Sequence, residues 1–351
     1  MTPSSKIYVA GHRGLVGSAI LRKLREQGFT RLITRSRAEL NLLDQAAVAS
    51  FFQAEKPEYV FLAAAKVGGI YANSTFPADF IHENLTIQTH VLHQSRQNGV
   101  KSLLFLGSSC IYPRLCPQPI KEEYLMTGPL EATNSAYAVA KIAGIEMCRA
   151  CNRQYGTRFI PVMPTNLYGP NDNFNLETSH VLPAMIRKFH LARLAVEKDW
   201  EGIDQDESVF GPIPGDIRQA IAAVDPPSVV LWGTGTPFRE FLHVDDLADA
   251  CIFLMSRPLE DTGSLLVNIG TGTDLSIRDL AGEIAQVVGY SGKIVWDTTK
   301  PDGTPRKLLD VSFLKNLGWQ PGISLREGLR RTYDWYRGKT CSSPSPSPLE
   351  P

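Results

Sequence analysis

Tyr137 and Lys141 form a Y-x-x-x-K pair in a stretch with a helical pattern, which places both side chains one turn apart on one helix face. A phenol beside an ammonium group is expected to have a pKa below its ordinary value of about 10. Such a phenol can exchange a proton with a sugar or alcohol oxygen near neutral pH. Ser108 lies upstream at the end of an apolar run and could hydrogen-bond to the same oxygen. The three residues predict proton transfer at an oxygen, coupled to movement of a hydride.

A glycine-rich turn follows the first apolar run of the chain, Lys6–Ala10. Gly11, Gly14 and Gly17 give the spacing G-x-x-G-x-x-G at the start of a helical pattern. Glycines at these positions let the backbone turn tightly and approach a pyrophosphate, which then lies at the helix N-terminus. The turn predicts dinucleotide binding, and a plain strand-to-helix turn is the alternative.

The charges after the second predicted strand indicate which dinucleotide would bind. Sites for NAD commonly hold the ribose with an acidic residue about 20 residues beyond the turn. Here the strand Arg31–Thr34 leads into Arg35, Ser36 and Arg37 without an acid, and Arg13 lies inside the turn. Guanidinium groups can form paired hydrogen bonds with a 2′-phosphate. We therefore expect NADP(H) as the cofactor.

Strands alternate with helices through the first half of the chain. Predicted strands cover Lys6–Ala10, Arg31–Thr34, Tyr59–Ala63, Ser102–Gly107 and Phe159–Met163. Predicted helices cover Leu15–Gln27, Ala46–Glu55, Phe76–Asn98, Ser135–Tyr155, Val244–Met255, Ser276–Val288 and Ser324–Arg337. This alternation is typical of βαβ units with right-handed crossovers. It predicts an α/β fold, a Rossmann-type doubly wound parallel sheet with a smaller, mixed α/β C-terminal substrate domain.

Domain boundaries are expected where the alternation becomes irregular. The cofactor domain is predicted to comprise residues 1–175 with a segment at about 240–270 returning to it, and the substrate domain residues 176–239 and 271–338. Asp199–Pro227 is rich in Asp, Gly and Pro, so we interpret it as a surface insertion. The Ser/Pro-rich tail, residues 339–351, is predicted to be disordered because it cannot bury a core.

Composition excludes several classes of function. The 36 Lys and Arg residues balance 36 Asp and Glu residues, which argues against nucleic acid or an anionic membrane as the main partner. No apolar run reaches the roughly 18 residues of a membrane-spanning helix. The six cysteines are scattered, and Cys148 and Cys151 lie inside one predicted helix without a second Cys or His pair. We therefore interpret this pair as structural, and expect no metal and a reduced, soluble, cytoplasmic protein.

Longer stretches of sequence are more specific than these spacings. They are AGHRGLVGSAI from Ala10, AAAKVGGIYAN from Ala63, LGSSCIYP from Leu106, MPTNLYGPNDNF from Met163, REFLHVDD from Arg239 and KPDGTPRKLLD from Lys300. Together they resemble the GDP-L-fucose synthase family of the extended short-chain dehydrogenases/reductases, over about residues 6–336. The resemblance implies NADPH-dependent conversion of GDP-4-keto-6-deoxy-D-mannose to GDP-L-fucose, by 3,5-epimerisation and then hydride reduction at C4.

The resemblance singles out Cys110 and His180 for the epimerisation. A 4-keto group acidifies the protons on C3 and C5, so inversion needs a base on one face of the ring and an acid on the other. A thiol and an imidazole, with ordinary pKa values of about 8.5 and 6.5, suit such proton exchange near pH 7. The family suggests Cys110 as base and His180 as acid, whereas the residue types leave the assignment open. On residue type alone, the more common role of a cysteine such as Cys110 is that of a small buried apolar residue, and His180 could be a surface histidine at a helix N-terminus.

The remaining site residues are also implied by the resemblance. Expected catalytic residues are Ser108, Cys110, Tyr137, Lys141 and His180. Expected NADP(H)-binding residues are Gly11, His12, Arg13, Gly14, Leu15, Val16, Gly17, Arg37, Asn41, Lys141, Pro164, Thr165, Asn166, Leu167 and His180. Expected substrate-binding residues are Lys188, Trp232, Arg239, Asp302 and Lys307. Arg239 is the strongest candidate for a diphosphate, whereas Asp302 and Lys307 could instead stabilise the loop around Gly303.

The helices Phe76–Asn98 and Ser135–Tyr155 resemble the pair through which this superfamily forms a four-helix bundle, so we expect a homodimer. Two other functions stay open. Another nucleotide-sugar 4-epimerase or 4-reductase of the superfamily would keep Tyr137 and Lys141 without needing Cys110. A non-catalytic dinucleotide-sensing protein would need the glycine turn and not the proton donor.

Overall fold

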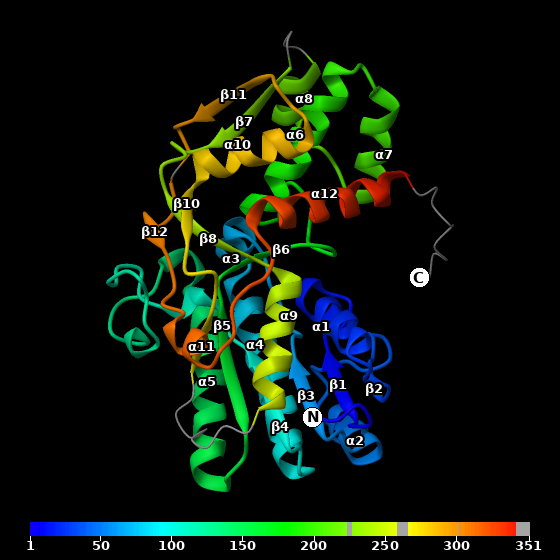
Figure 1. The fold of residues 1–351 in the computed structure, drawn as a ribbon, viewed down its shortest axis with the longest axis vertical. Coiled ribbons are helices and arrows are strands. Elements are labelled where there is room, and N and C mark those ends of the chain that lie inside the picture. Colours follow the sequence, from blue (N-terminus) through cyan, green and yellow to red (C-terminus); the bar gives the residue numbers. More distant parts are fainter. Residues whose placement is uncertain (223–226, 258–265, 301, 342–351) are drawn as a thin grey trace. The chain divides into compact units, whose positions relative to one another are not determined.

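The computed structural model describes residues 1–222, 227–257, 266–300 and 302–341, which form two compact units (Figure 1). The first unit comprises Met1–Asp172, Phe238–Leu275 and Thr304–Ile323. The second unit comprises Asn173–Pro237, Ser276–Gly303 and Ser324–Pro351. In the described part of the chain, no helix combines the length and the apolar character needed to cross a membrane.

The first unit is built on a six-stranded parallel sheet, which confirms the predicted Rossmann-type fold. Its strand order is β2-β1-β3-β4-β5-β9. The strands are β1 (Ile7–Ala10), β2 (Leu32–Ile33), β3 (Tyr59–Leu62), β4 (Ser102–Leu106), β5 (Phe159–Pro164) and β9 (Val267–Ile269). After β2 the chain returns past β1 to form β3, so the order of strands reverses beside β1. Open α/β sheets bind ligands at the carboxyl ends of the strands at such a reversal.

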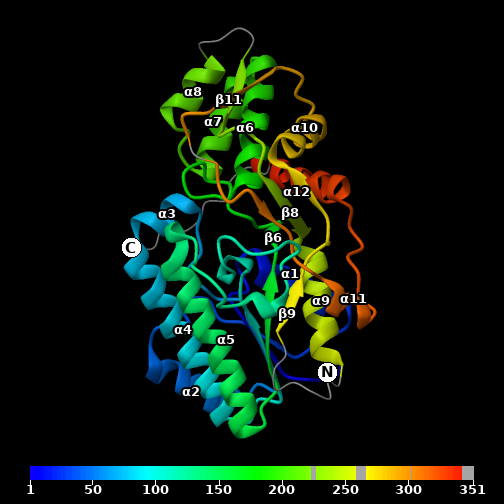
Figure 2. The same cartoon turned by 90° about the vertical axis from the view of Figure 1, so that its left-hand side faces the viewer.

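Two layers of helices cover the faces of this sheet, as Figure 2 shows. Alternate strand residues enter opposite cores, as the pleat of a strand requires: Ile7 and Val9 join one apolar cluster, Tyr8 and Ala10 the other. Helices α1 (Leu15–Glu26) and α9 (Val244–Ser256) pack together on one face, and α4 (Pro77–Gln97) and α5 (Ser135–Tyr155) on the other. The further helices of this unit are α2 (Gln45–Glu55), α3 (Ile70–Thr75), α11 (Ser312–Asn316) and the 3₁₀ turns η1 (Ser109–Ile111), η2 (Glu122–Tyr124) and η3 (Ala132–Asn134).

A smaller sheet adjoins the carboxyl end of β5. Its central strand β8 (Phe238–His243) pairs with β6 (Asn166–Tyr168), β12 (Arg306–Lys307) and β10 (Asp274–Ser276). The pairing of β12 with β8 brings Thr304–Ile323 into the first unit, whereas we expected this stretch in the second domain. The prediction failed because strand pairing joins segments about seventy residues apart, and two paired residues leave no local pattern.

The second unit is a mixed α/β structure. Its helices are α6 (Val181–Val196), α7 (Trp200–Phe210), α8 (Gly215–Ala222), α10 (Ile277–Val288) and α12 (Leu325–Cys341). Its strands β7 (Ser228–Trp232) and β11 (Lys293–Asp297) form a parallel pair in register from Ser228↔Lys293 to Trp232↔Asp297.

The interpretation of Asp199–Pro227 as a surface insertion is wrong, because the described part of this segment forms α7 and α8. Asp199 caps α7 by accepting a hydrogen bond from the backbone of Gly202 at 2.9 Å, and Gly211 ends the helix at a φ of +89°. Ile203 and Ile217 are buried. Asp199 and Gly211, which suggested a loop, therefore lie at the two ends of α7, whereas Asp204 and Asp206 lie inside it.

Helix α12 extends the fold beyond the expected boundary. Residues 339–341 are helical, so the predicted disordered tail does not begin at 339. The rest of that tail, residues 342–351, lies outside the described residues.

Candidate active site

The turn after β1 needs glycine at two positions. Gly11 has a φ of +82°, and a Cβ atom there would lie 2.7 Å from the backbone nitrogen of Ala64, just beyond β3. A Cβ on Gly17 would lie 2.1 Å from the carbonyl oxygen of Gly11. Gly14 is the N-cap of α1, whose first backbone N–H groups face the turn. The result is a bare, close-packed turn at a helix N-terminus, the arrangement that accommodates a pyrophosphate.

Of the three arginines expected near a 2′-phosphate, two are exposed and one is already paired. Arg13 and Arg37 are exposed. Arg35 forms an ion pair with Glu55, at 2.6 Å between Nη2 and Oε1, and its guanidinium lies 5.6 Å from the ring centre of Phe51. Arg35 is therefore held against α2, whereas Arg13 and Arg37 have exposed side chains. The Arg35–Glu55 ion pair could not be predicted from the sequence, because Glu55 lies 20 residues after Arg35, at the far end of α2.

Other expected cofactor residues frame the same edge of the sheet. Leu15 and Val16 form the first turn of α1, and Asn41 is exposed with its side chain accepting the backbone N–H of Leu43 at 3.1 Å. Burial and the Arg13 guanidinium lower the pKa of His12.

The segment from Pro164 to Leu167 leaves β5 and enters the small sheet. The hydroxyl of Thr165 and the side-chain amide of Asn166 both donate to the carbonyl oxygen of Glu240, at 3.2 Å and 2.8 Å. These bonds hold the backbone between the two sheets in one conformation. Residues Pro164–Leu167 thus form a fixed wall at the carboxyl end of β5.

Ser108, Tyr137 and Lys141 come together in the first unit, as predicted. Ser108 follows β4 and accepts the backbone N–H of Cys110 at 3.2 Å. Tyr137 and Lys141 lie one turn apart on α5, with Lys141 Nζ 5.8 Å from the centre of the Tyr137 ring. A hydrogen bond joins Tyr137 to Ser108. The structure therefore places a serine and a tyrosine hydroxyl side by side at the end of β4.

The expected effect of Lys141 on Tyr137 is not found. Burial raises the pKa of Tyr137, the Cys110 sulfur adds to the rise, and the hydrogen bond from Ser108 only partly opposes it. Lys141 is 3% exposed and donates to the carbonyl oxygen of Leu106 at 2.7 Å. Burial lowers the pKa of Lys141 to about 8. The prediction was wrong because spacing along a helix shows proximity and says nothing of burial, which acts on both groups here.

Cys110 has a cationic neighbour that the sequence did not indicate. Its Sγ lies 3.5 Å from Nζ of Lys307 on β12. Burial by itself raises the pKa of the thiol, but Lys307, a hydrogen bond with Ser108, and Arg239 together hold that pKa below its ordinary value. We expected Lys307 among the substrate-binding residues, so its contact with Cys110 is a new relation. Lys307 and Cys110 are 197 positions apart in the sequence, so their contact could be predicted only from the pairing of β12 with β8.

The other expected site residues belong to the second unit, apart from Arg239. Arg239 is half-buried on β8 and donates to the carbonyl oxygen of Phe238 at 2.7 Å. His180 is the exposed N-cap of α6. Lys188 on α6 donates to the carbonyl oxygen of Val230 at 3.0 Å, and burial lowers its pKa.

Trp232 and Asp302 lie at neighbouring loops of the second unit. Trp232 is 60% exposed, and Nζ of Lys300 lies 5.4 Å from its ring centre. Asp302 accepts the backbone N–H and the hydroxyl of Thr234, at 2.9 Å and 2.7 Å. An exposed indole beside a lysine can bind a flat ring or an anion, whereas Asp302 shapes the loop after β7.

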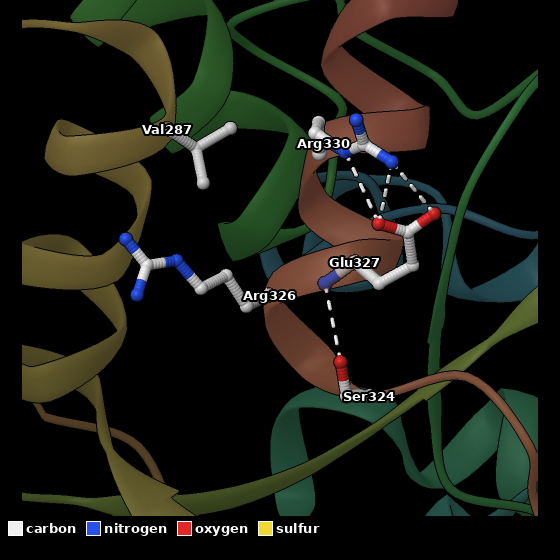
Figure 3. A pocket seen from close by; sticks show the side chains of 5 residues that line it. All are labelled: Val287, Ser324, Arg326, Glu327 and Arg330. Carbon is white, nitrogen blue, oxygen red and sulfur yellow. Dashed lines mark hydrogen bonds and ion pairs between the residues drawn. The ribbon is translucent and has the colours of Figure 1, made fainter.

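A pocket of about 420 Å³ in the second unit contains none of the expected residues (Figure 3). It is lined by Val287 of α10 and by Ser324, Arg326, Glu327 and Arg330 at the start of α12. Glu327 already pairs with Arg330 at 2.8 Å. Surface side chains surround this pocket, so it offers no chemistry comparable to that around Cys110.

Comparisons with known proteins show the family to which this chain belongs. Residues 7–270 match the NAD dependent epimerase/dehydratase family. GDP-L-fucose synthase 1 of Arabidopsis thaliana is 57% identical over 97% of this chain and 95% of its own length. GDP-L-fucose synthase of Escherichia coli K12 is 52% identical over 94% of this chain and 96% of its own.

The chain is also similar to solved structures. A GDP-D-glycero-L-gluco-heptose synthase from Campylobacter jejuni, solved in the presence of NADPH, is 42% identical with a TM-score of 0.87, covering 96% of this chain and 99% of that one. The match to the family spans most of the chain, and the curated relatives span nearly all of it. The chain belongs to the NAD dependent epimerase/dehydratase family, in the group that contains the GDP-L-fucose synthases.

Proposed function

We propose that this protein converts GDP-4-keto-6-deoxy-D-mannose to GDP-L-fucose, by 3,5-epimerisation followed by NADPH-dependent reduction at C4. The observation that carries the proposal is the cluster at the end of β4, where Cys110, with a lowered thiol pKa, lies beside the hydroxyl-bearing Ser108 and Tyr137. The GDP-L-fucose synthases of Arabidopsis thaliana and Escherichia coli K12 are 57% and 52% identical in sequence to this chain over nearly its whole length, which supports the same assignment.

The glycine turn fits the cofactor. Gly11 and Gly17 leave no room for a Cβ, so only backbone faces the place where a pyrophosphate would lie. Exposed Arg13 and Arg37 would hold the 2′-phosphate of NADP(H). When bound, NADPH supplies the hydride for C4.

Epimerisation is assigned to Cys110 and His180. A carbonyl at C4 acidifies the hydrogens on C3 and C5, so a thiolate can remove one of these protons. The negative charge then moves to O4, where the hydroxyls of Ser108 and Tyr137 would donate hydrogen bonds. Return of a proton to the opposite face of the ring inverts the carbon, and we assign that return to His180.

Reduction uses the same oxygen. As hydride arrives at C4, O4 becomes an alkoxide and takes the proton of Tyr137. The raised pKa of Tyr137 keeps the phenol protonated and therefore able to act as an acid. Lys141, buried behind the tyrosine, holds positive charge near the phenolate that remains. One site can thus perform both reactions, because charge collects on O4 in each of them.

Solvent exchange tests this function directly. The protein is supplied with GDP-4-keto-6-deoxy-D-mannose and NADPH in deuterated water, and the product is analysed by mass spectrometry and NMR. We expect NADPH consumption and deuterium at both C3 and C5. Reduction without label would identify a simple 4-reductase, and the absence of any oxidation of NADPH would identify a dinucleotide-sensing protein; either outcome rejects the proposal.

A cysteine variant links that result to the site. Cys110→Ser should lose the labelling at C3 and C5 while it still binds NADPH, measured by the quenching of protein fluorescence. Cys151→Ser is the matched control, because Cys151 is another partly buried cysteine and lies outside the cluster. Equal loss of labelling in both variants would remove Cys110 from the mechanism.

We also propose a homodimer that assembles through α4 and α5 and works in the cytoplasm. The two helices pack along each other on one face of the sheet, and α5 presents Val139 with 44% of its surface exposed. The described cysteines, residues 110, 116, 148, 151 and 251, are all free, which favours a reducing compartment.

A further inference from the structure

We propose that Lys307 is a positioning residue that keeps Cys110 as a thiolate, so that the sulfur is ready to remove a proton from the sugar. The contact is direct, with 3.5 Å between Nζ of Lys307 and Sγ of Cys110. The role of Lys307 in proton removal rests on the proposed function, whereas its effect on the thiol does not.

Lys307 is directed toward Cys110 by its place in β12. Successive side chains of a strand point to opposite sides. Arg306 accordingly turns to Asp274, with which it forms two hydrogen bonds at 2.6 Å and 3.1 Å. In the part of the chain that the structure describes, Lys307 has no comparable carboxylate partner, and its ammonium donates to the sulfur instead. Its positive charge is therefore available to the thiolate.

The strand that carries Lys307 is held from both sides. On one side β12 pairs with β8, where Lys307 stands opposite Arg239. On the other side, the backbone N–H of Leu308 donates to the side chain of Gln118 at 2.9 Å, and Ile120 donates to the carbonyl oxygen of Leu308 at 2.7 Å. Gln118 and Ile120 follow the turn that contains Cys110. The thiol and the ammonium thus belong to segments that are bonded to each other.

Buried Glu240 adds a third attachment. One of its carboxylate oxygens accepts the backbone N–H of Leu309 at 3.1 Å, and the other accepts those of Thr271 and Gly272 at 2.6 Å and 2.7 Å. Because Glu240 is fully buried, these bonds are shielded from water. The backbone that carries Lys307 is therefore held in place beside the turn that contains Cys110.

The charged and titratable groups that face Cys110 come from three elements. Lys307 on β12 and Arg239 on β8 stabilise the thiolate, and a hydrogen bond with Ser108 also lowers the pKa of the thiol. Tyr137 on α5 stays protonated, so it adds no negative charge. Cations thus prevail around the sulfur, and Lys307 is the strongest of them.

The first test measures the thiol in the full-length protein without substrate or cofactor. Cys110 is alkylated with iodoacetamide between pH 5.5 and 10, and its rate is read by peptide mass spectrometry, with Cys151 as an internal reference. The wild-type rate should rise with a midpoint below the ordinary thiol value of about 8.5. Lys307→Met should raise the midpoint and slow alkylation at pH 7 on the order of tenfold, one unit of pKa. Lys307→Arg should restore it.

A matched control and two contrary outcomes define the test. Lys101→Met removes an exposed lysine of the same unit and should leave the Cys110 curve unchanged. Identical curves for wild type and Lys307→Met would overturn the proposal, as would a wild-type midpoint at or above 8.5, which needs no variant at all. If Lys307→Met does not fold, judged by its melting curve, Lys307→Gln takes its place.

A second test separates this role from simple binding of the diphosphate. A lysine that only binds substrate would raise KM and leave unchanged the pH at which C3 and C5 exchange half-maximally with deuterated water. A lysine that stabilises the thiolate shifts that pH upward in Lys307→Met. If the proposed function itself fails, no exchange occurs, but the alkylation shift persists; if only the present proposal fails, exchange occurs and neither midpoint moves.

Discussion

Burial shifts the pKa of Tyr137 and the pKa of Lys141 in opposite directions. The phenol holds its proton more firmly, and the ammonium gives its proton up more easily. At neutral pH the pair therefore consists of a protonated acid and a cation that loses charge in mildly alkaline solution.

Removal of the phenol should separate the two chemical steps. Tyr137→Phe keeps the ring and its edge contact with Phe80, but it has no proton to give to O4. We expect NADPH oxidation to slow by about 10²- to 10⁴-fold, the usual contribution of a positioned acid, while some deuterium exchange at C3 and C5 persists. Tyr155→Phe, at the exposed end of the same helix, should behave as wild type. Loss of exchange and reduction to the same extent would contradict separate roles.

The charge of Lys141 should set the alkaline limit of reduction. Because burial lowers its pKa to about 8, the ammonium is present below that pH and is lost as pH rises through it. The rate of NADPH oxidation at saturating substrate should therefore fall above about pH 8. In Lys141→Met the rate should be low throughout, without this alkaline fall. A wild-type rate that stays level to pH 10 would show that the charge of Lys141 is not needed.

Sequence patterns predicted which residues form this cluster, but they did not predict the pKa shifts of those residues correctly. Y-x-x-x-K and the strand-end serine placed Ser108, Tyr137 and Lys141 correctly, because helix and strand periodicities are local rules. The sign of the Tyr137 shift was wrong, since burial depends on how α5 packs against the sheet. The contact between Cys110 and Lys307 was missed because it depends on pairing between distant strands.

At the level of elements, the buried contact between α6 and α7 explains how Trp200–Phe210 can belong to the core of the second unit. Arg187 of α6 is fully buried and pairs with the buried Asp206 of α7, at 2.7 Å between Nε and Oδ1. Its Nη1 donates to the carbonyl oxygens of Phe174 and Phe210 at 3.2 Å and 3.0 Å, and its Nη2 donates to that of Gly211 at 2.5 Å. Tyr336 of α12 donates to the second oxygen of Asp206. The charge pair therefore joins three helices of the second unit.

Removing one partner of the Arg187–Asp206 pair should lower the free energy of unfolding strongly, whereas replacing both partners with apolar residues should lower it much less. Asp206→Ala leaves a buried guanidinium without its counter-ion, and such losses cost about 3–5 kcal/mol. The double variant Arg187→Met, Asp206→Leu should recover much of that loss, because no charge stays buried. Glu197→Gln breaks an exposed pair on α6 and should cost at most about 0.5 kcal/mol. Urea unfolding followed by circular dichroism measures all three; equal costs for Asp206→Ala and Glu197→Gln would contradict the argument.

Element boundaries were predicted well where apolar periodicity was strong. The predicted strand Tyr59–Ala63 became β3, and the helix predicted from Ser276 became α10, which Ser276 caps by accepting the backbone N–H of Asp279 at 3.0 Å. The helices α7 and α8 were missed because Asp, Gly and Pro residues, which are common in loops, lie within and beside them. The buried pair that holds α7 in place has no signature in a single sequence.

At the level of the whole molecule, the chain passes between its two units five times, so neither unit is a continuous piece. The first unit obtains part of one helix layer from its second segment, in which Leu247, Ile252 and Leu254 of α9 are fully or almost fully buried. β9, the edge strand beside β5, comes from the same segment. The first 172 residues therefore contain five of the six strands and lack part of their cover.

A fragment of residues 1–172 should not fold on its own. Each large apolar side chain that loses its cover forgoes about 1.5–3 kcal/mol, and a few such losses exceed the 5–15 kcal/mol by which domains are usually stable. We expect the fragment to aggregate or bind a hydrophobic dye, whereas a chain of residues 1–341, which keeps every described segment, stays soluble. A cooperative melting transition of the 1–172 fragment would contradict this.

The proposed dimer gives a prediction about assembly. Val139→Glu places a charge on the exposed side of α5 and should convert the protein from two chains to one, measured by light scattering on a sizing column. Val209→Glu changes an equally exposed valine on α7 of the second unit and should leave the mass unchanged, since the exposed fractions are 44% and 45%. A wild-type mass of one chain would reject the dimer.

The discontinuous first unit also has a consequence for synthesis. The ribosome releases β5 well before it has made α9 and β9, whose last residue lies about a hundred positions beyond the first segment. At about 5–20 residues per second, the part of the sheet face that α9 covers stays exposed for roughly 5–20 s. During that interval the sheet exposes Leu104, Leu106 and Val162, which are buried in the finished protein. Yield of soluble protein should therefore depend on chaperones and on growth temperature more than the stability of the completed fold would suggest.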